Sequence, residues 1–250
     1  MTEWPGLLRS LIVYWRPGRQ HRLRQLYRSL VSPGDLVFDV GAHLGDRSAA
    51  FAALGAHVVA IEPQPHVACW LRRIVARYAR VTVRDEAVGR STGTARLAIS
   101  RRNPTVSTLA KEWREKLPRA NRSFRDVKWE TFVDVQVTTL DALIDMYGMP
   151  RFCKIDVEGY ESEVLVGLTR PIPGISIEFI SGNLDQARVC VERLRDLGMY
   201  EFNAIRGENR GFVFDNWVTP EQIIIWLKDG AGGVSSGDLY ARLLHGIHHD

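Results

Sequence analysis

Apolar runs with the length of a buried strand recur five times along the chain, and each carries a carboxylate at or near its end. The runs are Val37-Phe38-Asp39-Val40, Val58-Val59-Ala60-Ile61-Glu62, Val81-Thr82-Val83-Arg84-Asp85-Glu86, Phe152-Cys153-Lys154-Ile155-Asp156 and Ile175-Ser176-Ile177-Glu178. Nearly continuous apolar strands are typical of parallel sheets that are buried on both faces. Because parallel strands present their carboxyl ends at one edge, the pattern predicts an α/β sheet with a row of acids in its ligand crevice.

Segments with helical periodicity separate these strands, as the crossover connections of a parallel sheet require. Helices are predicted over residues 7–15, 23–30, 47–54, 66–78, 141–146, 161–168 and 184–197, with Asp141 as the cap of the fifth. Further strands are predicted over 95–100 and over 132–137, the latter at a sheet edge. A hairpin of residues 200–205 and 211–214 is predicted to complete the sheet with an antiparallel last strand.

The 250 residues are enough for one substantial core with extensions. We expect a basic helical extension over residues 1–32 and one α/β domain over 33–216, interrupted by a basic insertion at 101–131. A C-terminal helix and tail are expected over 217–250.

The first strand opens into a glycine turn whose spacing separates two kinds of ligand. Gly41 and Gly45 form Gly-x-x-x-Gly, and His43 stands where a dinucleotide fingerprint needs glycine to approach a pyrophosphate. Glu62, 21 residues after Gly41, ends the second strand, where an acid accepts hydrogen bonds from ribose hydroxyls. Asp39 puts a carboxylate where it favours a ligand's ammonium group. Together they favour S-adenosylmethionine over a nicotinamide dinucleotide.

Four motifs of the chain resemble those of the FkbM-type methyltransferases, in the family's order. They are Phe38-Asp39-Val40-Gly41-Ala42-His43-Leu44-Gly45, Glu62-Pro63, Thr139-Leu140-Asp141 and Lys154-Ile155-Asp156-Val157-Glu158-Gly159-Tyr160-Glu161. The resemblance implies a Rossmann-like class I methyltransferase fold: a mostly parallel seven-stranded sheet with an antiparallel last strand. It implies S-adenosylmethionine as methyl donor and, usually, a hydroxyl acceptor on a sugar or natural product. Residues 33–216 would then be the methyltransferase domain.

The cofactor is expected to lie along the carboxyl ends of the first four strands. The residues expected to contact it are Asp39, Gly41, Ala42, His43, Gly45, Glu62, Asp85, Glu86, Ala87 and Asp156. After the third strand an acid can accept from the exocyclic amine of adenine, and the backbone N–H of Ala87 can donate to a ring nitrogen. Whether Asp85 or Glu86 points inward depends on a one-residue register that the sequence leaves open.

Methylation of an alcohol requires a base that removes a proton as the oxygen attacks. The candidates are Asp156, Glu178, Glu158 and His43. Each has a structural alternative. Glu158 stands at a helix start, where a carboxylate favours the helix dipole. Lys154 could be the ion-pair partner of Asp156 or Glu178, and His43 could bond only to the backbone.

The same carboxylates raise the question of a metal. Asp156 and Glu178 offer the oxygen ligands that Mg²⁺ or Ca²⁺ prefers, and a metal would acidify the acceptor hydroxyl. However, Lys154 is close in sequence and no third ligand is evident. A divalent metal is therefore not favoured, and no metal ligand is assigned.

Basic residues are concentrated in two segments of the chain, and this distribution is compatible with a second function, RNA methylation. Residues 1–30 hold six arginines against one glutamate, and residues 101–130 hold nine lysines and arginines against four acids. The second segment is predicted to be a lid over the acceptor, with Lys111, Arg114 and Lys116 favouring an anionic acceptor. Its aromatic residues Trp113, Phe124 and Trp129 could instead stack bases, as in an RNA methyltransferase.

That alternative is weakened because no Asn/Asp-Pro-Pro-aromatic run follows the fourth strand, so nucleic acid is an unlikely partner and a small molecule or glycan is expected. A third alternative, a non-catalytic nucleotide-binding module, is weakened by the intact row of acids.

The remaining expectations concern location and assembly. Cys69, Cys153 and Cys190 lie far apart and form no Cys-x-x-Cys pair, which favours free thiols in a reducing, cytoplasmic setting. No run of about 18 apolar residues occurs, so no transmembrane segment is expected. The N-terminal helices are expected to pack on the sheet or to form a homo-oligomer contact.

Overall fold

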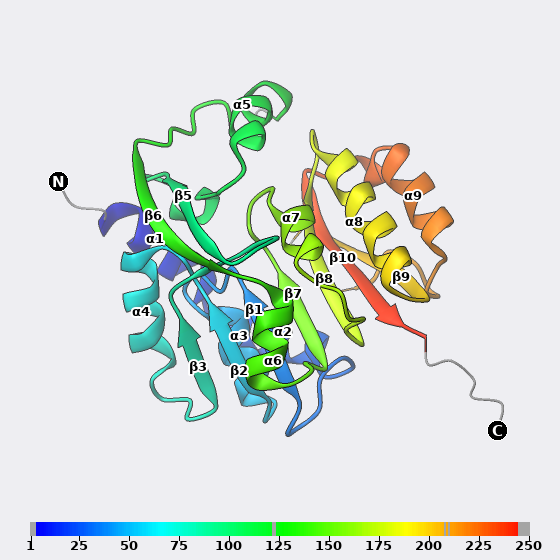
Figure 1. The fold of residues 1–250 in the computed structure, drawn as a ribbon, viewed down its shortest axis with the longest axis horizontal. Helices are drawn as coiled ribbons and strands as arrows, with labels where there is room; N and C mark the ends of the chain where they lie inside the picture. Colours follow the sequence, from blue (N-terminus) through cyan, green and yellow to red (C-terminus); the bar gives the residue numbers. More distant parts are fainter. Residues whose placement is uncertain (1–3, 122–123, 208, 210, 245–250) are drawn as a thin grey trace.

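A computed structural model of the chain describes residues 4–121, 124–207, 209 and 211–244. Its centre is a seven-stranded sheet in the order β3-β2-β1-β7-β8-β10-β9, parallel except where β10 pairs with its two neighbours (Figure 1). The strands are β1 (Leu36–Val40), β2 (His57–Ile61), β3 (Val81–Arg84), β7 (Phe152–Ile155), β8 (Gly174–Ile180), β9 (Tyr200–Arg206) and β10 (Ser236–Leu243). The predicted mostly parallel seven-stranded sheet with an antiparallel last strand is confirmed.

Helices cover both faces of this sheet, because alternate residues of each strand point to opposite sides. Phe38 and Val40 of β1 belong to the core cluster formed with α6 to α9, whereas Val37 belongs to the one formed with α2 and α3. The helices are α1 (Trp4–Tyr14), α2 (Arg19–Tyr27), α3 (Asp46–Ala53), α4 (Pro65–Val75), α5 (Lys111–Ala120), α6 (Leu140–Tyr147), α7 (Glu161–Val166), α8 (Leu184–Leu197) and α9 (Pro220–Lys228).

The antiparallel strand is not the one that the sequence predicted. β10 lies between β8 and β9 and takes the ladder that residues 211–214 were expected to fill. Those residues contribute one isolated bridge, from Phe212 to Ile205, and the Phe212 ring packs against Tyr240 of β10. β10 packs closely against β9, since a Cβ at Gly237 would lie 2.3 Å from the carbonyl oxygen of Ile205.

A second, three-stranded sheet stands beside the carboxyl ends of the main sheet. It consists of β4 (Ala87–Val88), β6 (Thr131–Thr138) and β5 (Gly93–Ile99), in that order. The prediction that 132–137 forms an edge strand is therefore wrong, because β6 pairs with β5 on one side and β4 on the other. Its alternating pattern reflects one face packed on the small apolar cluster of Ala87, Leu97 and Val135.

The start of α6 also differs from the prediction. Thr139, not Asp141, caps the helix, and its hydroxyl accepts from the backbone N–H of Ala142. The Asp141 carboxylate instead accepts from the backbone N–H and hydroxyl of Thr169, so it fixes the turn that follows α7.

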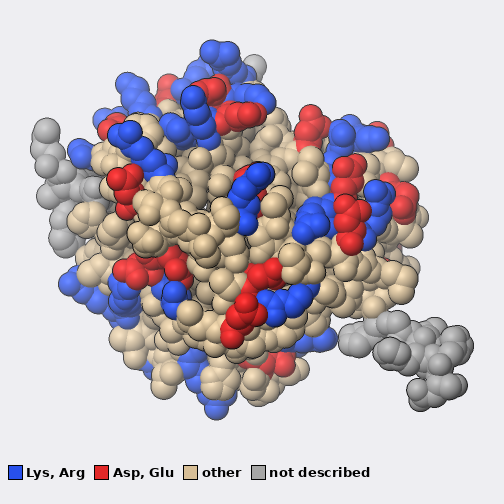
Figure 2. Space-filling view, in the orientation of Figure 1, with Lys and Arg blue, Asp and Glu red and all other residues tan. Residues whose placement is uncertain are grey.

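The basic insertion has its own small core. Trp113 and Leu117 of α5 are buried against Val106 and against Ile180 of β8. The Trp113 ring meets those of Phe124 and Trp129 edge to face. Trp113 is thus enclosed in this core and unavailable for stacking bases, and the half-buried Phe124 and Trp129 help to stabilise the insertion from within. Figure 2 shows that Lys and Arg gather at the top of the molecule, with acidic side chains among them.

None of the described helices combines the length and the apolar character needed to cross a membrane. The three cysteines are free, with Cys153 and Cys190 buried and Cys69 exposed.

The N-terminal extension is fastened to the main domain by a buried ion pair. Arg19 of α2 donates from Nε to Asp46 Oδ2 at 2.7 Å, and Gln20 donates from Nε2 to the Asp46 carbonyl oxygen at 2.8 Å. Leu23 and Tyr27 of the same helix pack on Phe51 of α3. The first turn of α3 is therefore held from outside by α2.

Replacing Arg19 with leucine should lower the free energy of unfolding by about 3 kcal/mol, because removal of one partner from a buried pair leaves an uncompensated charge. Urea denaturation followed by circular dichroism measures this. Arg22→Leu, at an exposed position of the same helix, should change stability little. Equal unfolding free energies for the two variants would contradict a stabilising role for the pair.

Candidate active site

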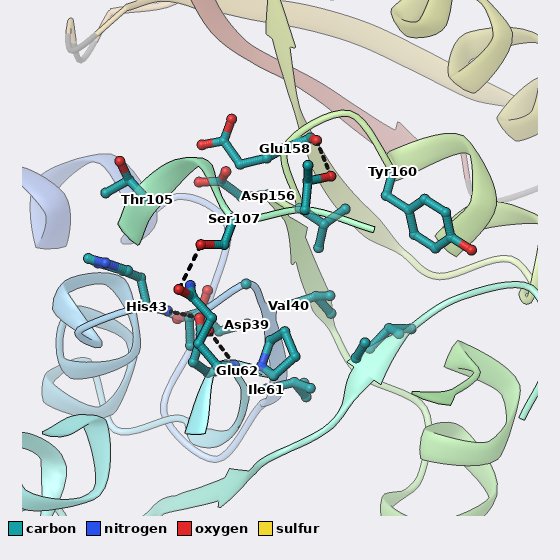
Figure 3. A pocket seen from close by; sticks show the side chains of 18 of the residues that line it. Asp39, Val40, His43, Ile61, Glu62, Thr105, Ser107, Asp156, Glu158 and Tyr160 are labelled. Atoms are coloured by element: carbon teal, nitrogen blue, oxygen red, sulfur yellow. Dashed lines mark hydrogen bonds between the residues drawn. The ribbon is translucent and has the colours of Figure 1, made fainter. Parts of the chain in front are cut away.

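An open cavity of about 960 Å³, counting the space open to solvent, lies at the carboxyl ends of β1, β2, β7 and β8. The glycine turn after β1, the small sheet, the insertion and the end of α1 surround it. Figure 3 shows Asp39, His43 and Glu62 on one side of the cavity, Asp156 and Glu158 on the other, and Ser107 between them.

The backbone of the turn explains its glycines. Gly41 has φ 79°, and a Cβ there would lie 1.8 Å from the carbonyl oxygen of Asp156, so only glycine lets the two loops meet. Gly45 does not line the cavity. Its φ is 72°, and a Cβ would lie 2.5 Å from Leu71, so this glycine lets α3 pack against α4. Ala42 and His43, which lie between the two glycines in the sequence, line the cavity.

Glu62 is buried and oriented by two backbone groups. Its Oε2 accepts from the N–H of His43 at 3.0 Å, and its Oε1 accepts from the N–H of Gln64 at 2.9 Å. Burial raises its pKa to about 7, although both hydrogen bonds oppose the rise. The side chain therefore faces the cavity in a fixed orientation with lone pairs left for a ligand.

Asp39 is fully buried and only half satisfied. Ser48 donates from its hydroxyl to Asp39 Oδ2 at 2.5 Å, whereas Oδ1 has no hydrogen-bond partner. Burial raises the pKa of this carboxyl, and the nearby Lys154 ammonium opposes the rise. A buried oxygen without a partner is costly, so Asp39 is suited to accept from a bound ligand.

Lys154 lies in β7 next to Asp39 of β1 and is only 2% exposed. Its ammonium donates to Asp156 Oδ2 at 2.7 Å. Burial opposes ionisation of Asp156, but Lys154 and Arg47 outweigh it and hold the pKa of Asp156 below its usual range. Of the two partners left open for Lys154, Asp156 is thus the observed one.

Glu158 and Glu178 complete a cluster with Asp156, whose ligand oxygens lie within 4.8 Å of one another. Burial raises the pKa of both glutamates well above the usual range, and Asp156 adds to the effect. The Oε2 atom of each is buried without a partner. Three such carboxylates could hold Mg²⁺ or Ca²⁺, and Glu158 is the third oxygen ligand that was not evident in the sequence. Because Lys154 already neutralises Asp156, we still assign no metal.

His43 occupies the turn with φ 48°. Burial lowers its pKa to about 4, so the imidazole is neutral at pH 7. Its backbone N–H donates to Glu62, whereas its imidazole Nε2 is buried without a partner and makes no bond to the backbone. The Tyr14 ring meets the imidazole edge to face with centroids 5.4 Å apart.

The register after β3 is resolved. Glu86 and Ala87 line the cavity, whereas Asp85 points away and forms an ion pair with Arg72 of α4 at 3.0 Å. Arg84 donates to Glu86 at 2.6 Å and holds its side chain.

Several cavity residues were not predicted from the sequence. They are Tyr14, Asp46, Arg47, Gln64, Thr105, Ser107, Thr108 and Tyr160, among others. Tyr14 comes from α1, and Arg47 lies between Asp46 and Asp238 at 3.9 and 4.0 Å. Two features of the sequence could have indicated these cavity residues. Arg47 follows the glycine turn closely, and residues 105–108 contain three hydroxyl side chains. By contrast, Lys111, Arg114 and Lys116 do not line the cavity.

This strand order, with a ligand cavity bounded by a glycine turn and carboxylates, is the arrangement expected of a Rossmann-like class I methyltransferase that uses S-adenosylmethionine. The sequence model of the methyltransferase FkbM domain matches residues 39–214. The chain therefore belongs to the FkbM methyltransferase family, as its motifs predicted.

Solved structures of methyltransferases are similar in fold at low identity. The precorrin-6y C5,15-methyltransferase of Geobacter metallireducens is 12% identical, with 90% of this chain and 88% of that chain covered and a TM-score of 0.47. An S-adenosylmethionine-dependent O-methyltransferase of Thermotoga maritima is 13% identical, with 98% and 74% covered and a TM-score of 0.45. Fibrillarin of Aeropyrum pernix with natively bound S-adenosylmethionine is 10% identical, with 85% and 68% covered and a TM-score of 0.43. No curated protein matches the chain.

The pKa of Glu62 predicts a pH dependence of stability in the ligand-free protein. It is about 7 in the folded chain and 4.5 as the ordinary value, so the folded state favours the protonated form. Stability from this group is complete below pH 4.5 and is lost as pH rises through 7. At about 1.4 kcal/mol per pKa unit, the loss is about 3 kcal/mol.

Urea unfolding across this pH range should show a weaker decline for Glu62→Gln than for the wild type. A residual decline is expected, because burial also raises the pKa of Glu161 to about 7. Glu115→Gln, at an exposed position, is the control. Identical pH slopes for the wild type and Glu62→Gln would refute the burial effect.

Proposed function

We propose that this methyltransferase transfers the methyl group to a hydroxyl of a sugar, glycan or natural product. The observation that supports this is the cluster of Asp156, Glu158 and Glu178, which brings unsatisfied carboxylate oxygens together in the cavity. Carboxylates accept hydrogen bonds from hydroxyls, and one of them can take the proton that an alcohol must lose.

The residues of the opposite wall fit the donor. Glu62 would accept from the ribose hydroxyls, and the partnerless Asp39 Oδ1 suits the ammonium group. Glu86 and the backbone of Ala87 would contact adenine. The bound cofactor supplies a methyl group on a positively charged sulfur, which an acceptor oxygen can attack. What the chain itself must do is orient the acceptor and receive its proton.

Among the four base candidates, Glu178 fits best. It projects from the regular strand β8, and its Oε2 is free, whereas Asp156 is engaged by Lys154. A carboxyl with a raised pKa is a stronger base once ionised than an ordinary one. Glu158, on a loop with φ 54°, then serves to hold the shared proton of the cluster. His43, with its lowered pKa, is a weaker base.

The insertion at 101–131 is proposed as the acceptor lid, with recognition by hydroxyl groups rather than by its charges. Thr105, Ser107, Thr108 and Leu109 line the cavity. Ser107 donates to Gln64 Oε1 at 2.8 Å, and Thr108 donates to the Glu158 carbonyl oxygen at 2.7 Å. These bonds link the lid to both walls. Lys116, by comparison, pairs with Glu112 at the surface.

Calorimetry should detect binding of S-adenosylmethionine and S-adenosylhomocysteine but not of NAD, because His43 blocks the approach of a pyrophosphate. Glu62→Gln should weaken donor binding about tenfold, since a hydrogen bond to a charged acceptor contributes about 1.5–3 kcal/mol. Asp85→Asn is the matched control, because Asp85 points away from the cavity. Unchanged affinity in Glu62→Gln, or NAD binding alone, would refute the donor assignment.

Once a screen of sugars and glycans finds an acceptor, Glu178→Gln should lower kcat about 10²–10⁴-fold while donor affinity stays the same. Wild-type kcat/KM should rise with pH as the cluster loses its protons. Glu158→Gln should have a smaller effect, and Glu163→Gln, at the surface, should have none. Full activity in Glu178→Gln would transfer the role of base to another residue.

A further inference from the structure

Helix α1 carries an apolar face that the described part of the chain leaves uncovered. Leu8, Ile12 and Val13 are 59%, 67% and 43% exposed, and their spacing places them side by side on the helix surface. The opposite face is occupied, since Leu7 is buried in a cluster with Leu44 and Val67. The helix therefore directs apolar side chains outward as well as inward.

The segment that carries this apolar face is rich in arginine and contains no acid. Residues 4–34 contain six arginines and no aspartate or glutamate. Three of these arginines are exposed and form no ion pair with any described residue: Arg9, Arg16 and Arg22. Arg19 instead forms the buried ion pair with Asp46. An anionic membrane surface consists of acyl chains and phosphate groups. An apolar helix face can contact the acyl chains, and exposed guanidinium groups without an ion-pair partner can contact the phosphates.

We propose that α1 binds the surface of an anionic lipid membrane, lying in the plane of the interface with Leu8, Ile12 and Val13 inserted among the lipids. Arg9, Arg16 and Arg22 contact the phosphate groups. This mode of binding needs no membrane-spanning helix, because an amphipathic helix buries only one face.

A second copy of the chain fits this surface less well. A twofold contact places the same patch of each subunit against the other, so arginines would face arginines with no acid between them. RNA fits less well too, because phosphates would satisfy the arginines but leave the three aliphatic side chains exposed to water.

Membrane binding would place the cavity at the interface. Tyr14, at the end of α1, lines the cavity, and Trp15 donates from Nε1 to the carbonyl oxygen of Leu44 in the glycine turn. Figure 1 shows α1 beside α4 and β6. Leu97 of the small sheet also lines the cavity. The docked enzyme would thus meet acceptors carried at a membrane surface. The docking itself does not depend on which acceptor is used.

Sedimentation with lipid vesicles tests the proposal. The full chain should bind phosphatidylcholine vesicles that contain phosphatidylglycerol, bind pure phosphatidylcholine vesicles weakly, and be released by salt. Ile12→Ser should weaken binding about tenfold. Arg9→Gln combined with Arg16→Gln should weaken it about 25-fold, from about fivefold for each cation near an anionic surface.

Ile225→Ser is the matched control, because Ile225 is 58% exposed on the surface of another helix, α9. It should bind vesicles like the wild type, and all variants should keep the wild-type melting temperature and donor affinity. Absence of binding to anionic vesicles, or equal losses in Ile12→Ser and Ile225→Ser, would overturn the proposal. So would a concentration-dependent dimer abolished by Ile12→Ser, or RNA binding without vesicle binding.

Discussion

The acidic edge of the main sheet depends on one buried cation, the ammonium group of Lys154. This side chain is 2% exposed in the central strand β7, beside Asp39 and 2.7 Å from Asp156. A buried ammonium costs several kcal/mol unless carboxylates compensate it, and carboxylates this close repel one another unless a cation lies among them. Burial of the lysine therefore depends on the nearby carboxylates, and the close approach of the carboxylates depends on the lysine. As a result, a buried part of the sheet carries charged side chains.

That mutual dependence divides the carboxylates into two kinds. Lys154 keeps Asp156 ionised. The pKa values of Glu158 and Glu178 are instead raised, first by burial and then by the negative charge of Asp156. One cavity wall thus offers a permanent negative charge next to groups that hold protons. Carboxyl groups whose surroundings push their pKa values apart are the usual basis for moving a proton within a site. The glycine turn adds proximity, because Gly41 brings the loop of Asp156 against the end of β1.

The sequence predicted the strands, the glycine turn and most of the acids, because periodicity and motif spacing are local properties. Tyr14 was missed because its place in the cavity follows from how α1 packs, and a helical pattern does not say what its faces contact. Arg47, in the first turn of α3, was missed because no local pattern indicates its contact with Asp238 of β10. The choice between Asp85 and Glu86 depended on one residue of register. Strand β10 was missed because it begins with Ser-Gly-Asp, whereas the apolar run at 211–214 resembled a strand and is a loop.

The position of β10 has a consequence for how the protein forms during synthesis. β9 leaves the ribosome before β10, yet its ladder in the main sheet is with β10, which inserts between β8 and β9. Until Ser236–Leu243 has emerged, β8 has an open edge and α8 and β9 have no finished sheet to pack on. The half of the sheet that bears Glu178 is thus completed last, so a nascent chain can form the strands that lead to Asp39 and Glu62 well before that half is complete. Such an interval exposes an unpaired apolar strand, the situation in which chaperones protect growing chains.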